Sequence, residues 1–408
     1  MLVVVRILFV VPYVPTLIRV RPYNLVRYLA RHGHRLTLAT LWETDDERRA
    51  LAEFESLDVE VIAAPLTRNR KLLNLAMALP TAHPLQANFC WQPELAARLD
   101  GLVAARDFDA IHVEHLRGSR YALHLKRKTQ NAKHKIPVVW DSVDSITHLF
   151  EQAAKQSQSA KGKLMTSFEL PRTRRSEGWL AAQFDRVLVT SPTDRAALEA
   201  LSPHHAPIIV LPNGVDLDYF RPCDDVPREP DALVFSGKMS YHANVTAALH
   251  LVNDIMPRVW SRKPHTRLWI VGKDPTEEVR ALAMRYPERV KVTGAVPDMR
   301  AYLRQATVAV VPVVYGAGIQ NKVLEAMACA TPVVTSARTV ASLQPGYEDA
   351  ALVADGAEAF AHHVLRLLDE PHLRERLGNA GRRYVEAHHD WNVIVDRLAG
   401  IYEEARAG

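Results

Sequence analysis

The sequence predicts an α/β fold divided between two domains. Its 408 residues are too many for one ordinary hydrophobic core and suit two domains of roughly 200 residues each. Residues 307–336, TVAVVPVVYGAGIQNKVLEAMACATPVVTS, have the pattern of a strand, a glycine loop, a helix and a second strand. Residues 3–41 have a similar order of strand, helix and strand. Right-handed βαβ units in both halves of the chain indicate parallel sheets covered by helices.

The composition is that of a globular protein, with 48% hydrophobic and 24% charged residues. A net charge of +5 suits anionic donors or an anionic membrane surface, and no basic-aromatic cluster points to nucleic acid. The three cysteines are odd in number and far apart, which argues against a disulfide framework and favours a reducing compartment.

The apolar N-terminus indicates a buried first strand rather than a secretion signal. Arg6 interrupts the apolar run, and no small-residue cleavage site follows it. No uninterrupted apolar run reaches the roughly 18 residues that a membrane span requires. We therefore expect a cytoplasmic protein, with contact at the inner face of the membrane as an option.

The first domain opens with a strand at 3–11, a helix at 21–32 and a strand at 34–41. Gly33 ends the helix. Arg21 opens it, and is either a ligand contact or a solvated first-turn arginine.

Two basic segments follow in the first domain. Residues 67–80, TRNRKLLNLAMALP, combine a basic head with an apolar helix. Such a helix can lie on anionic lipid, or it can be an ordinary amphipathic helix packed on the domain. Residues 126–135, KRKTQNAKHK, suit a solvated loop before a strand at 137–140.

Polar residues follow two of the predicted strands. The strand at 109–115 ends in Glu114 and His115, at the edge where open α/β sheets place ligands. Asp141 and Asp144 close the next strand, and each is either near a ligand or the N-cap of a helix.

The remaining segments complete two domains joined at 208–222, IIVLPNGVDLDYFRP, whose Asn-Gly pair is a turn signal. A Pro-rich, charged linker follows. The expected strands and helices after the first domain's strand at 137–140 are these: a helix then a strand within 177–190, a helix at 191–201, strands at 232–235, 268–272 and 290–297, a helix at 298–305, a strand at 349–354, and helices at 358–368, 372–388 and 391–405.

The corner within 307–336 is suited to a phosphate. Gly316 and Gly318 leave room for a ligand at the backbone, and the following helix N-terminus offers free N–H groups. Lys322 and Glu325 share one helical face, so a cation for phosphates is followed by a carboxylate for sugar hydroxyls. The alternative is an ordinary surface ion pair. Adjacent histidine pairs do not share a helical face, so we expect no metal site.

The order G-x-G-x-x-x-K-x-x-E, followed by A-M-A-C-x-T-P-V-V, resembles the donor-site helix of family-4 retaining glycosyltransferases with the two-Rossmann GT-B architecture. P-N-G-V-D leading to Phe220 and Pro222 resembles the segment that joins their two halves. The resemblance implies two Rossmann-like domains facing each other across a cleft. The acceptor side is 1–212 with a C-terminal helix, 391–408, that crosses back to it, and the donor side is 213–390.

The resemblance also implies the chemistry. A nucleotide-diphosphate sugar donor passes its sugar to a hydroxyl acceptor, a saccharide or a lipid-linked saccharide, without a metal ion or other cofactor. Lys238 and Lys322 stabilise the leaving diphosphate, Glu325 binds ribose hydroxyls and His115 lies beside the sugar. The remaining expected contacts are, for the donor, Gly237, Val296, Gly316, Gly318, Ile319, Gln320 and Asn321, and, on the acceptor side, Arg21, Glu114 and Asp144.

Three departures from the family pattern stand out. The loop after the first strand has no glycine, and uncharged Ala243 and Asn244 stand where a second cation is usual. Ala317 replaces a common glutamate, which leaves backbone amides near Gly318 to orient the sugar. Two alternatives to a transferase are a catalytically degenerate partner subunit and a nucleotide-sugar epimerase, although no convincing acid/base pair for an epimerase is present.

Overall fold

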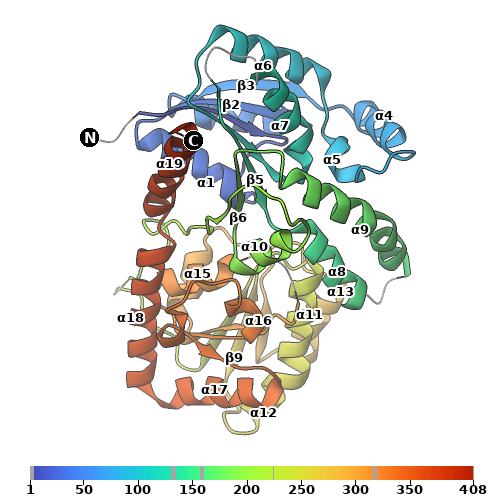
Figure 1. The fold of residues 1–408 in the computed structure, drawn as a ribbon. Coiled ribbons are helices and arrows are strands. Elements are labelled where there is room, and N and C mark those ends of the chain that lie inside the picture. The colour runs from blue at the N-terminus through green and yellow to red at the C-terminus, as the bar shows by residue number, and fades with distance from the viewer. Residues whose placement is uncertain (1–3, 130–134, 157–159, 224, 316–318, 408) are drawn as a thin grey trace. The chain divides into compact units, whose positions relative to one another are not determined.

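The chain forms two α/β units. A computed structural model describes residues 4–129, 135–156, 160–223, 225–315 and 319–407. Unit 1 comprises residues 1–212 and 394–408, and unit 2 comprises residues 213–393. Figure 1 labels the elements of both units.

Unit 1 contains a parallel sheet of seven strands in the order β3-β2-β1-β4-β5-β6-β7. Ile7 of β1 lies opposite Leu36 of β2 on one side and Ala110 of β4 on the other. Because the order reverses at β1, the connecting helices cover both faces of the sheet. The strands are β1 (Arg6–Val11), β2 (Arg35–Trp42), β3 (Glu60–Pro65), β4 (Ala110–Glu114), β5 (Val138–Val143), β6 (Arg186–Val189) and β7 (Ile208–Val210).

The helices of unit 1 separate these strands. They are α1 (Val20–Arg31), α2 (Asp45–Ala50), α3 (Ala52–Glu55), α4 (Arg68–Ala78), α5 (Leu85–Phe89), α6 (Pro93–Ala105), α7 (His115–Thr129), α8 (Ile146–Gln156), α9 (Ala160–Leu180), α10 (Pro192–Glu199) and the C-terminal α19 (Trp391–Ala407). Ser191 caps α10 by accepting a hydrogen bond from the N–H of Asp194, as expected for a cap residue before a Pro-initiated helix.

Unit 2 contains six parallel strands in the order β10-β9-β8-β11-β12-β13. They are β8 (Ala232–Ser236), β9 (Arg267–Val271), β10 (Val290–Val292), β11 (Val308–Val311), β12 (Val333–Thr335) and β13 (Leu352–Val353). The helical elements are α11 (His242–His250), η1 (Leu251–Ile255), α12 (Met256–Trp260), α13 (Glu277–Arg285), α14 (Met299–Gln305), α15 (Asn321–Ala328), α16 (Ala337–Val340), η2 (Tyr347–Asp349), α17 (Ala357–Asp369) and α18 (Pro371–His388).

Both sheets are buried on two faces, which explains the continuous apolar runs in the sequence. Every residue of β8 and β11 is buried, and in β1 only Arg6 is exposed. The strand, helix and strand predicted within 307–336 are present as β11, α15 and β12, and β11 pairs in parallel with β12 on one side and with β8 on the other.

The basic segment at 126–135 was predicted as a loop, and this is wrong for its first part. Residues 126–129 form the last turn of α7, where Lys126, Arg127 and Lys128 complement the negative end of the helix dipole. Residues 130–134 lie outside the described part of the chain.

The amphipathic helix α4 turns Leu72 and Leu73 away from the rest of unit 1. Its leucines were expected either against the domain or on lipid, and Leu72, Leu73 and Leu79, which follows the helix, are exposed. The buried side instead carries Asn74, whose amide donates to the carbonyls of Phe89 and Trp91. The alternative in which these leucines pack on the domain is therefore wrong.

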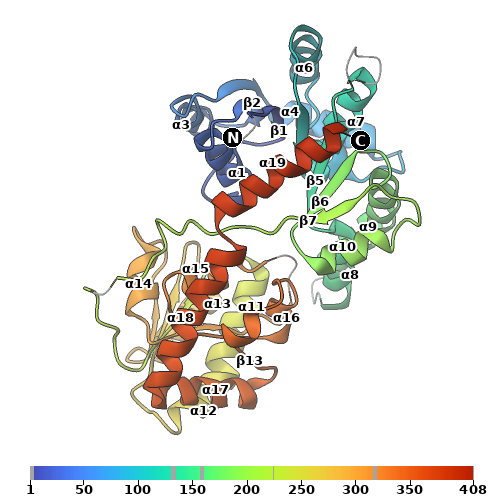
Figure 2. The ribbon, with the colours of Figure 1, turned by 60° about the vertical axis from the view of Figure 1, so that its left-hand side comes forward.

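The C-terminal helix α19 packs into unit 1 from residue 394 onward, as the resemblance implied. The Tyr402 hydroxyl lies 2.9 Å from Nδ1 of His112 in β4, and His32 at the end of α1 contacts Asp396. Figures 1 and 2 both show α19 beside α1. All three cysteines are free, and none of the described helices is long and apolar enough to cross a membrane.

Candidate functional site

Unit 2 places its candidate site at the point where the strand order reverses, between β8 and β11. In open parallel sheets, the loops leaving the carboxyl ends of such strands diverge and leave a crevice for a ligand. The loop after β8 carries Gly237 and Lys238, and the loop after β11 leads through Tyr315 to α15. The predicted donor residues therefore come from both sides of this crevice.

Glycines allow the backbone to pack closely at this edge of the sheet. Gly272, after β9, has a φ of +150°, and a Cβ there would lie 1.7 Å from the carbonyl oxygen of Gly237. Gly237 has a φ of +146°, and a Cβ there would lie 2.8 Å from Nδ2 of Asn244 and 3.2 Å from Cε of Lys322. Gly237 thus brings the β8 loop, α11 and α15 into contact.

Lys322 lies directly over this glycine. Its Nζ donates a hydrogen bond to Oε1 of Gln320 at 2.8 Å. Burial lowers the pKa of Lys322 to about 8, while the nearby Glu325 acts to raise it. Burial also raises the pKa of Glu325 to about 7, and Lys322 acts to lower it. Both side chains therefore lie where charge is poorly solvated, so a bound anion would favour the charged form of the lysine.

The start of α15 leaves polar groups for a ligand. Gln320 is its N-cap, but the side chain of Gln320 makes no capping hydrogen bond. Oδ1 of Asn321 is buried and has no partner among the described residues. Ile319 is buried in the core of unit 2, so only its backbone can contact a ligand. Gly316, Ala317 and Gly318 lie outside the described residues.

Lys238 and Asn244 have different roles in the β8 loop. The side chain of Lys238 is 51% exposed and its Nζ lies 3.9 Å from a carboxylate oxygen of Asp274. Asn244, at the position without the usual cation, donates from Nδ2 to the carbonyl of Lys238 at 2.9 Å. Its Oδ1 is buried without a partner among the described residues. Asn244 therefore supports the loop and keeps one free acceptor.

Sequence reasoning missed an aromatic pair beside this crevice. The rings of His242 and Tyr315 are stacked, with centroids 5.3 Å apart. The Tyr315 hydroxyl lies within hydrogen-bonding distance of both His242 Nδ1 and Thr246 Oγ1. Neither residue belongs to a spacing pattern, so only their places beside the two loops could have indicated them. Val296, the predicted nucleobase contact, follows β10 and lies partly against the core.

Unit 1 has a corresponding reversal between β1 and β4. The Tyr13 hydroxyl, after β1, donates to Oε1 of Glu114 at 3.0 Å, and the Arg19 guanidinium lies 4.0 Å from the centre of the Tyr13 ring. Burial, together with the charge of Asp141, raises the pKa of Glu114 to about 8. This edge therefore holds a carboxyl group that keeps its proton near neutral pH.

His115 begins α7 in a left-handed conformation, with a φ of +65°. Its Nδ1 accepts a hydrogen bond from the N–H of Arg117 at 3.2 Å. Burial lowers the pKa of His115 to about 4. The imidazole is therefore neutral near pH 7, and its Nδ1 accepts a backbone hydrogen bond in the first turn of α7.

The other two predicted acceptor residues make hydrogen bonds within unit 1. Arg21 is 3% exposed, donates to Oδ2 of Asp141 at 2.7 Å and donates to the carbonyl of Leu211 at 2.9 Å. The alternative of a solvated arginine is therefore wrong. Asp144 is partly buried and accepts a hydrogen bond from Oγ1 of Thr190 at 3.0 Å.

The N-cap alternative for Asp141 and Asp144 is also wrong. The hydroxyl of Ser145 caps α8 by accepting from the N–H of His148. Asp141 lies within β5 and accepts from the N–H of Val143. Within the described residues, no group of three His, Cys, Asp or Glu side chains could hold a metal ion. Metal independence of the reaction stays a prediction.

Two family models match this chain in tandem. The "Glycosyl transferase 4-like domain" matches residues 18–214, and "Glycosyl transferases group 1" matches residues 230–370. The chain belongs to the group 1 glycosyl transferases. The two matches cover most of unit 1 and most of unit 2, which confirms the resemblance drawn from the motifs.

Curated relatives of this glycosyltransferase include two mannosyltransferases. A phosphatidyl-myo-inositol mannosyltransferase of Mycobacterium tuberculosis is 28% identical over 236 residues, covering 53% of this chain and 59% of the relative. A GDP-mannose-dependent monoacylated alpha-(1-6)-phosphatidylinositol monomannoside mannosyltransferase of Corynebacterium glutamicum is 28% identical over 297 residues, covering 66% of this chain and 77% of the relative. The chain thus spans about 59% of the first relative's length.

Solved structures of similar fold cover almost the whole glycosyltransferase chain. A sucrose-phosphate synthase from Thermosynechococcus elongatus aligns with a TM-score of 0.68 at 19% identity, over 98% of this chain and 99% of that one. Anabaena HepE, in complex with UDP and glucose, aligns with a TM-score of 0.63 at 14% identity, over 98% and 99% of the two chains. These likenesses confirm the predicted GT-B fold with two Rossmann-like units.

Proposed function

We propose that this protein transfers a sugar from a nucleotide-diphosphate sugar to the hydroxyl group of an acceptor, with retention at the anomeric carbon. Unit 2 binds the donor, and unit 1 binds the acceptor. The reaction belongs to the synthesis of a polysaccharide or glycolipid. The family membership supports the reaction class, and the residues of unit 2 support the donor site.

One observation carries the proposal: Cε of Lys322 lies 3.2 Å from the place of a Cβ on Gly237, where the strand order of unit 2 reverses. A diphosphate that enters this crevice meets the Lys322 ammonium, the N-terminus of α15 and the backbone of Gly237. The Lys238 ammonium is the second cation in reach of the same loop. Glycosyl transfer leaves negative charge on the diphosphate, so these groups stabilise the transition state electrostatically.

The remaining residues orient the donor. Glu325 accepts hydrogen bonds from ribose hydroxyls, which lowers the cost of holding a partly buried carboxylate. The free Oδ1 acceptors of Asn244 and Asn321 bind donor hydroxyls. The leaving phosphate itself deprotonates the incoming hydroxyl, so the mechanism needs neither a metal ion nor a dedicated protein base.

The relatives support the choice of donor and acceptor classes. One relative is named as GDP-mannose-dependent, and HepE was solved with UDP and with UDP-glucose. The mannosyltransferase relatives are named for phosphatidylinositol acceptors. A UDP- or GDP-sugar and a saccharide or lipid-linked acceptor therefore fit this chain.

The experiment is a panel of UDP-, GDP- and dTDP-sugars, with release of the nucleoside diphosphate measured in the presence of EDTA. We expect slow hydrolysis of one donor, and loss of at least about tenfold in turnover for Lys322→Ala and for Glu325→Ala. Lys291→Ala, which removes an exposed lysine on β10 of the same unit, is the control. Isomerised sugar would indicate an epimerase, and no binding of any donor would indicate a degenerate partner subunit.

A further inference from the structure

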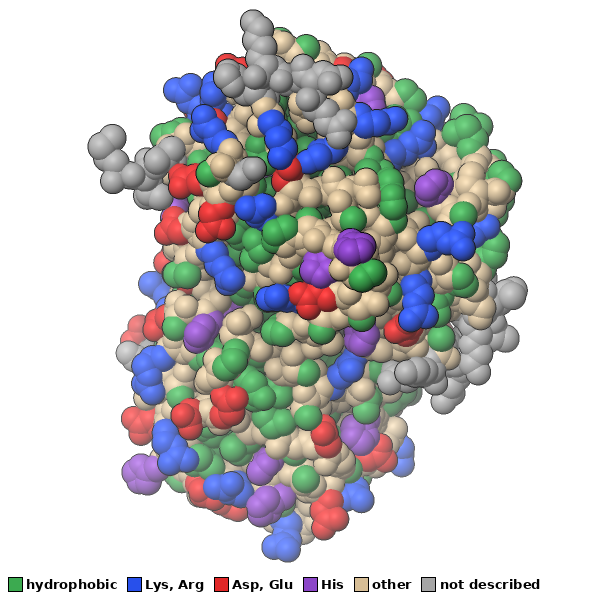
Figure 3. Space-filling view, viewed as in Figure 1, with side chains coloured by type: hydrophobic (Ala, Val, Ile, Leu, Met, Phe, Trp, Pro, Cys, Tyr) green, Lys and Arg blue, Asp and Glu red, His purple; other side chains and the backbone are tan. Residues whose placement is uncertain are grey.

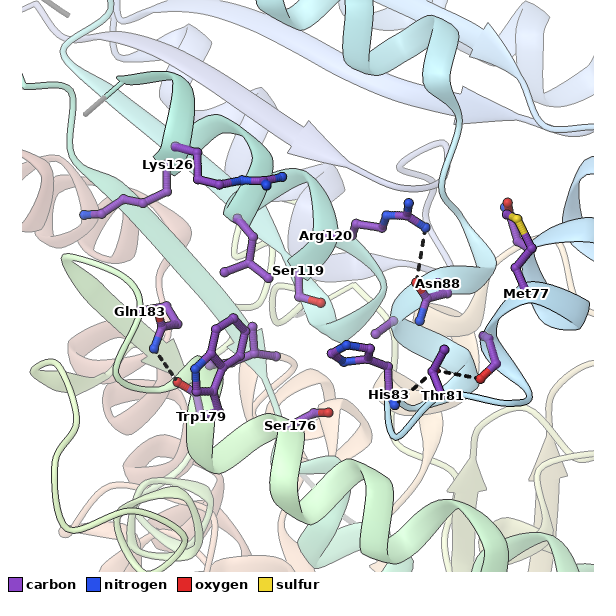
Figure 4. Close-up of a pocket in the computed structure, with 16 residues that line it drawn as sticks. Met77, Thr81, His83, Asn88, Ser119, Arg120, Lys126, Ser176, Trp179 and Gln183 are labelled. Carbon is purple, nitrogen blue, oxygen red and sulfur yellow. Dashed lines mark hydrogen bonds between the residues drawn. The ribbon is translucent and has the colours of Figure 1, made fainter. Parts of the chain in front are cut away.

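A separate cavity of about 610 Å³ lies in unit 1, away from the reversal between β1 and β4. It is bounded by α4, α5, α7, α9 and the turn before α5, and Figure 4 shows its lining. Its α7 residues run from Ser119 to Arg127, about 6 Å to 18 Å along the helix from His115 at the carboxyl end of β4. The cavity is therefore on a helical face of the unit and not at the candidate catalytic edge.

One part of the lining is apolar and open to solvent. Trp179 of α9 is 49% exposed and Met77 of α4 is 48% exposed, and Leu123 of α7 and the buried Leu180 of α9 also line the cavity. Single exposed apolar side chains are common on protein surfaces, but a group of them around one cavity indicates a binding site. In Figure 4 the Trp179 indole stands on the α9 side, facing α7. This wall offers a surface for an apolar chain.

The apolar surface continues outside the cavity along the same two helices. The exposed leucines of α4 lie beside Met77, and Phe168 of α9 is also exposed. Arg172 joins the two helices, because it donates to the carbonyl of Leu79 at 2.9 Å and lies 3.9 Å from the ring centre of Phe168. An apolar chain leaving the cavity thus meets further apolar side chains with a cation between them.

The opposite wall is cationic. Arg120, Lys126 and Arg127 line the cavity from α7, and no carboxylate is among its lining residues, all of which the structure describes. Lys126 pairs with Asp185, so its charge is compensated. Burial lowers the pKa of Arg120, and the charges of Arg70 and Arg127 lower it further. The arginines therefore leave this wall electropositive.

Arg120 and the nearby Arg70 make their polar contacts with neutral groups. Arg120 donates to Oδ1 of Asn88 at 3.2 Å and lies 4.3 Å from the ring centre of Trp91. Arg70 donates to the carbonyl of Trp91 at 3.3 Å. Guanidinium groups held in this way remain complementary to a phosphate. Figure 3 shows Lys and Arg side chains beside hydrophobic ones on this face of unit 1.

We propose that this cavity binds a phosphate-bearing lipid of a membrane, with the phosphate at Arg120 and Arg127 and the apolar chain along Trp179 and Met77. The site anchors unit 1 to an anionic membrane through one specific lipid molecule. Charge complementarity favours a phosphate over a neutral headgroup, and arginine guanidinium groups bind phosphate oxygens in a bidentate manner. The inference does not rest on the proposed donor site.

The test is isothermal titration of the full chain with monomeric decyl phosphate, below the concentration at which it forms micelles. We expect saturable binding of one molecule per chain. Arg127→Gln and Trp179→Ala should each weaken it at least about tenfold, and both replaced side chains are exposed, so the variants should fold. The matched controls are Lys128→Gln, whose side chain pairs with Asp100, and Met284→Ala, which is exposed in unit 2.

Four further probes decide the chemistry of the ligand. Inorganic phosphate that binds as tightly as decyl phosphate would overturn the apolar part of the proposal, and decyl maltoside or decanoate that binds as tightly would overturn the phosphate part. Vesicles of phosphatidylcholine with phosphatidylglycerol should bind the chain, and the two cavity variants should reduce this binding more than their controls. Equal effects of variants and controls, or no saturable binding, would refute the site. UDP and GDP titrations on the same samples report on the donor site separately.

Discussion

Replacing Gly237 with alanine tests the packing on which the donor site depends. The new Cβ would lie 2.8 Å from Nδ2 of Asn244 and 3.2 Å from Cε of Lys322, and both groups would have to move. Movement of Asn244 breaks its 2.9 Å hydrogen bond to the carbonyl of Lys238. The substitution therefore disturbs both predicted diphosphate-binding lysines while leaving their charges in place.

The magnitude follows from two contributions. A non-glycine residue at a φ of +146° costs about 1–3 kcal/mol, and the lost hydrogen bond costs about 1 kcal/mol. We expect Gly237→Ala to lower the free energy of unfolding by about 2–4 kcal/mol and to weaken UDP or GDP binding at least about tenfold. The control is Gly356→Ala, at a φ of +80° with nothing within 4 Å of the added Cβ.

Chemical denaturation and isothermal titration calorimetry measure the two effects in both variants. Gly356→Ala should lose about 1–3 kcal/mol of stability and keep its nucleotide affinity, because it carries the backbone strain alone. A folded Gly237→Ala variant that binds nucleotide as tightly as Gly356→Ala would show that nucleotide binding does not depend on the packing of Gly237 against Asn244 and Lys322. Equal stability losses in the two variants would refute the contribution from Asn244.

Three other predictions concern charge and hydrogen bonding. Because burial lowers the pKa of Lys322 to about 8, affinity for UDP or GDP should fall between about pH 7 and about pH 9, and calorimetry should show no such fall in Lys322→Arg. Burial raises the pKa of Glu114 from 4.5 to about 8, so the folded chain holds a proton that the unfolded chain releases. The free energy of unfolding should fall as the pH rises between these values, and denaturation curves of Glu114→Gln should show a smaller fall. Tyr402→Phe removes the hydroxyl beside His112 and should lower the free energy of unfolding by about 1–3 kcal/mol, whereas Tyr219→Phe, at an exposed position, should change it little.

The fold was predictable because local patterns and the burial of both sheet faces agree. The β-branched runs at 308–311 and 333–335 had to be buried strands, and the connection between them had to be a right-handed helical crossover. The same patterns placed Gly237 directly after one strand and Lys322 on the helix that follows another. The contact between Gly237 and Lys322 depends on the order of the strands in the sheet. The resemblance implies that order, and the residue spacing does not.

Residues with distant partners could not be assigned in the same way. Arg21 is buried because Asp141, 120 positions away, pairs with it, and no local pattern near Arg21 indicates that partner. The exposed leucines of α4 have the periodicity of a packed helix, but the Asn74 amide takes the buried side by binding two carbonyls. Helical periodicity identifies an apolar face without showing which face the rest of the unit covers.

The most direct measurement is a crystal structure of the full chain with UDP or GDP bound. We expect diphosphate oxygens within about 3 Å of Nζ of Lys322 and next to the backbone of Gly237, at the carboxyl ends of β8 and β11. A nucleotide bound to unit 1, or at another edge of the unit 2 sheet with Lys322 still bonded only to Gln320, would contradict this expectation.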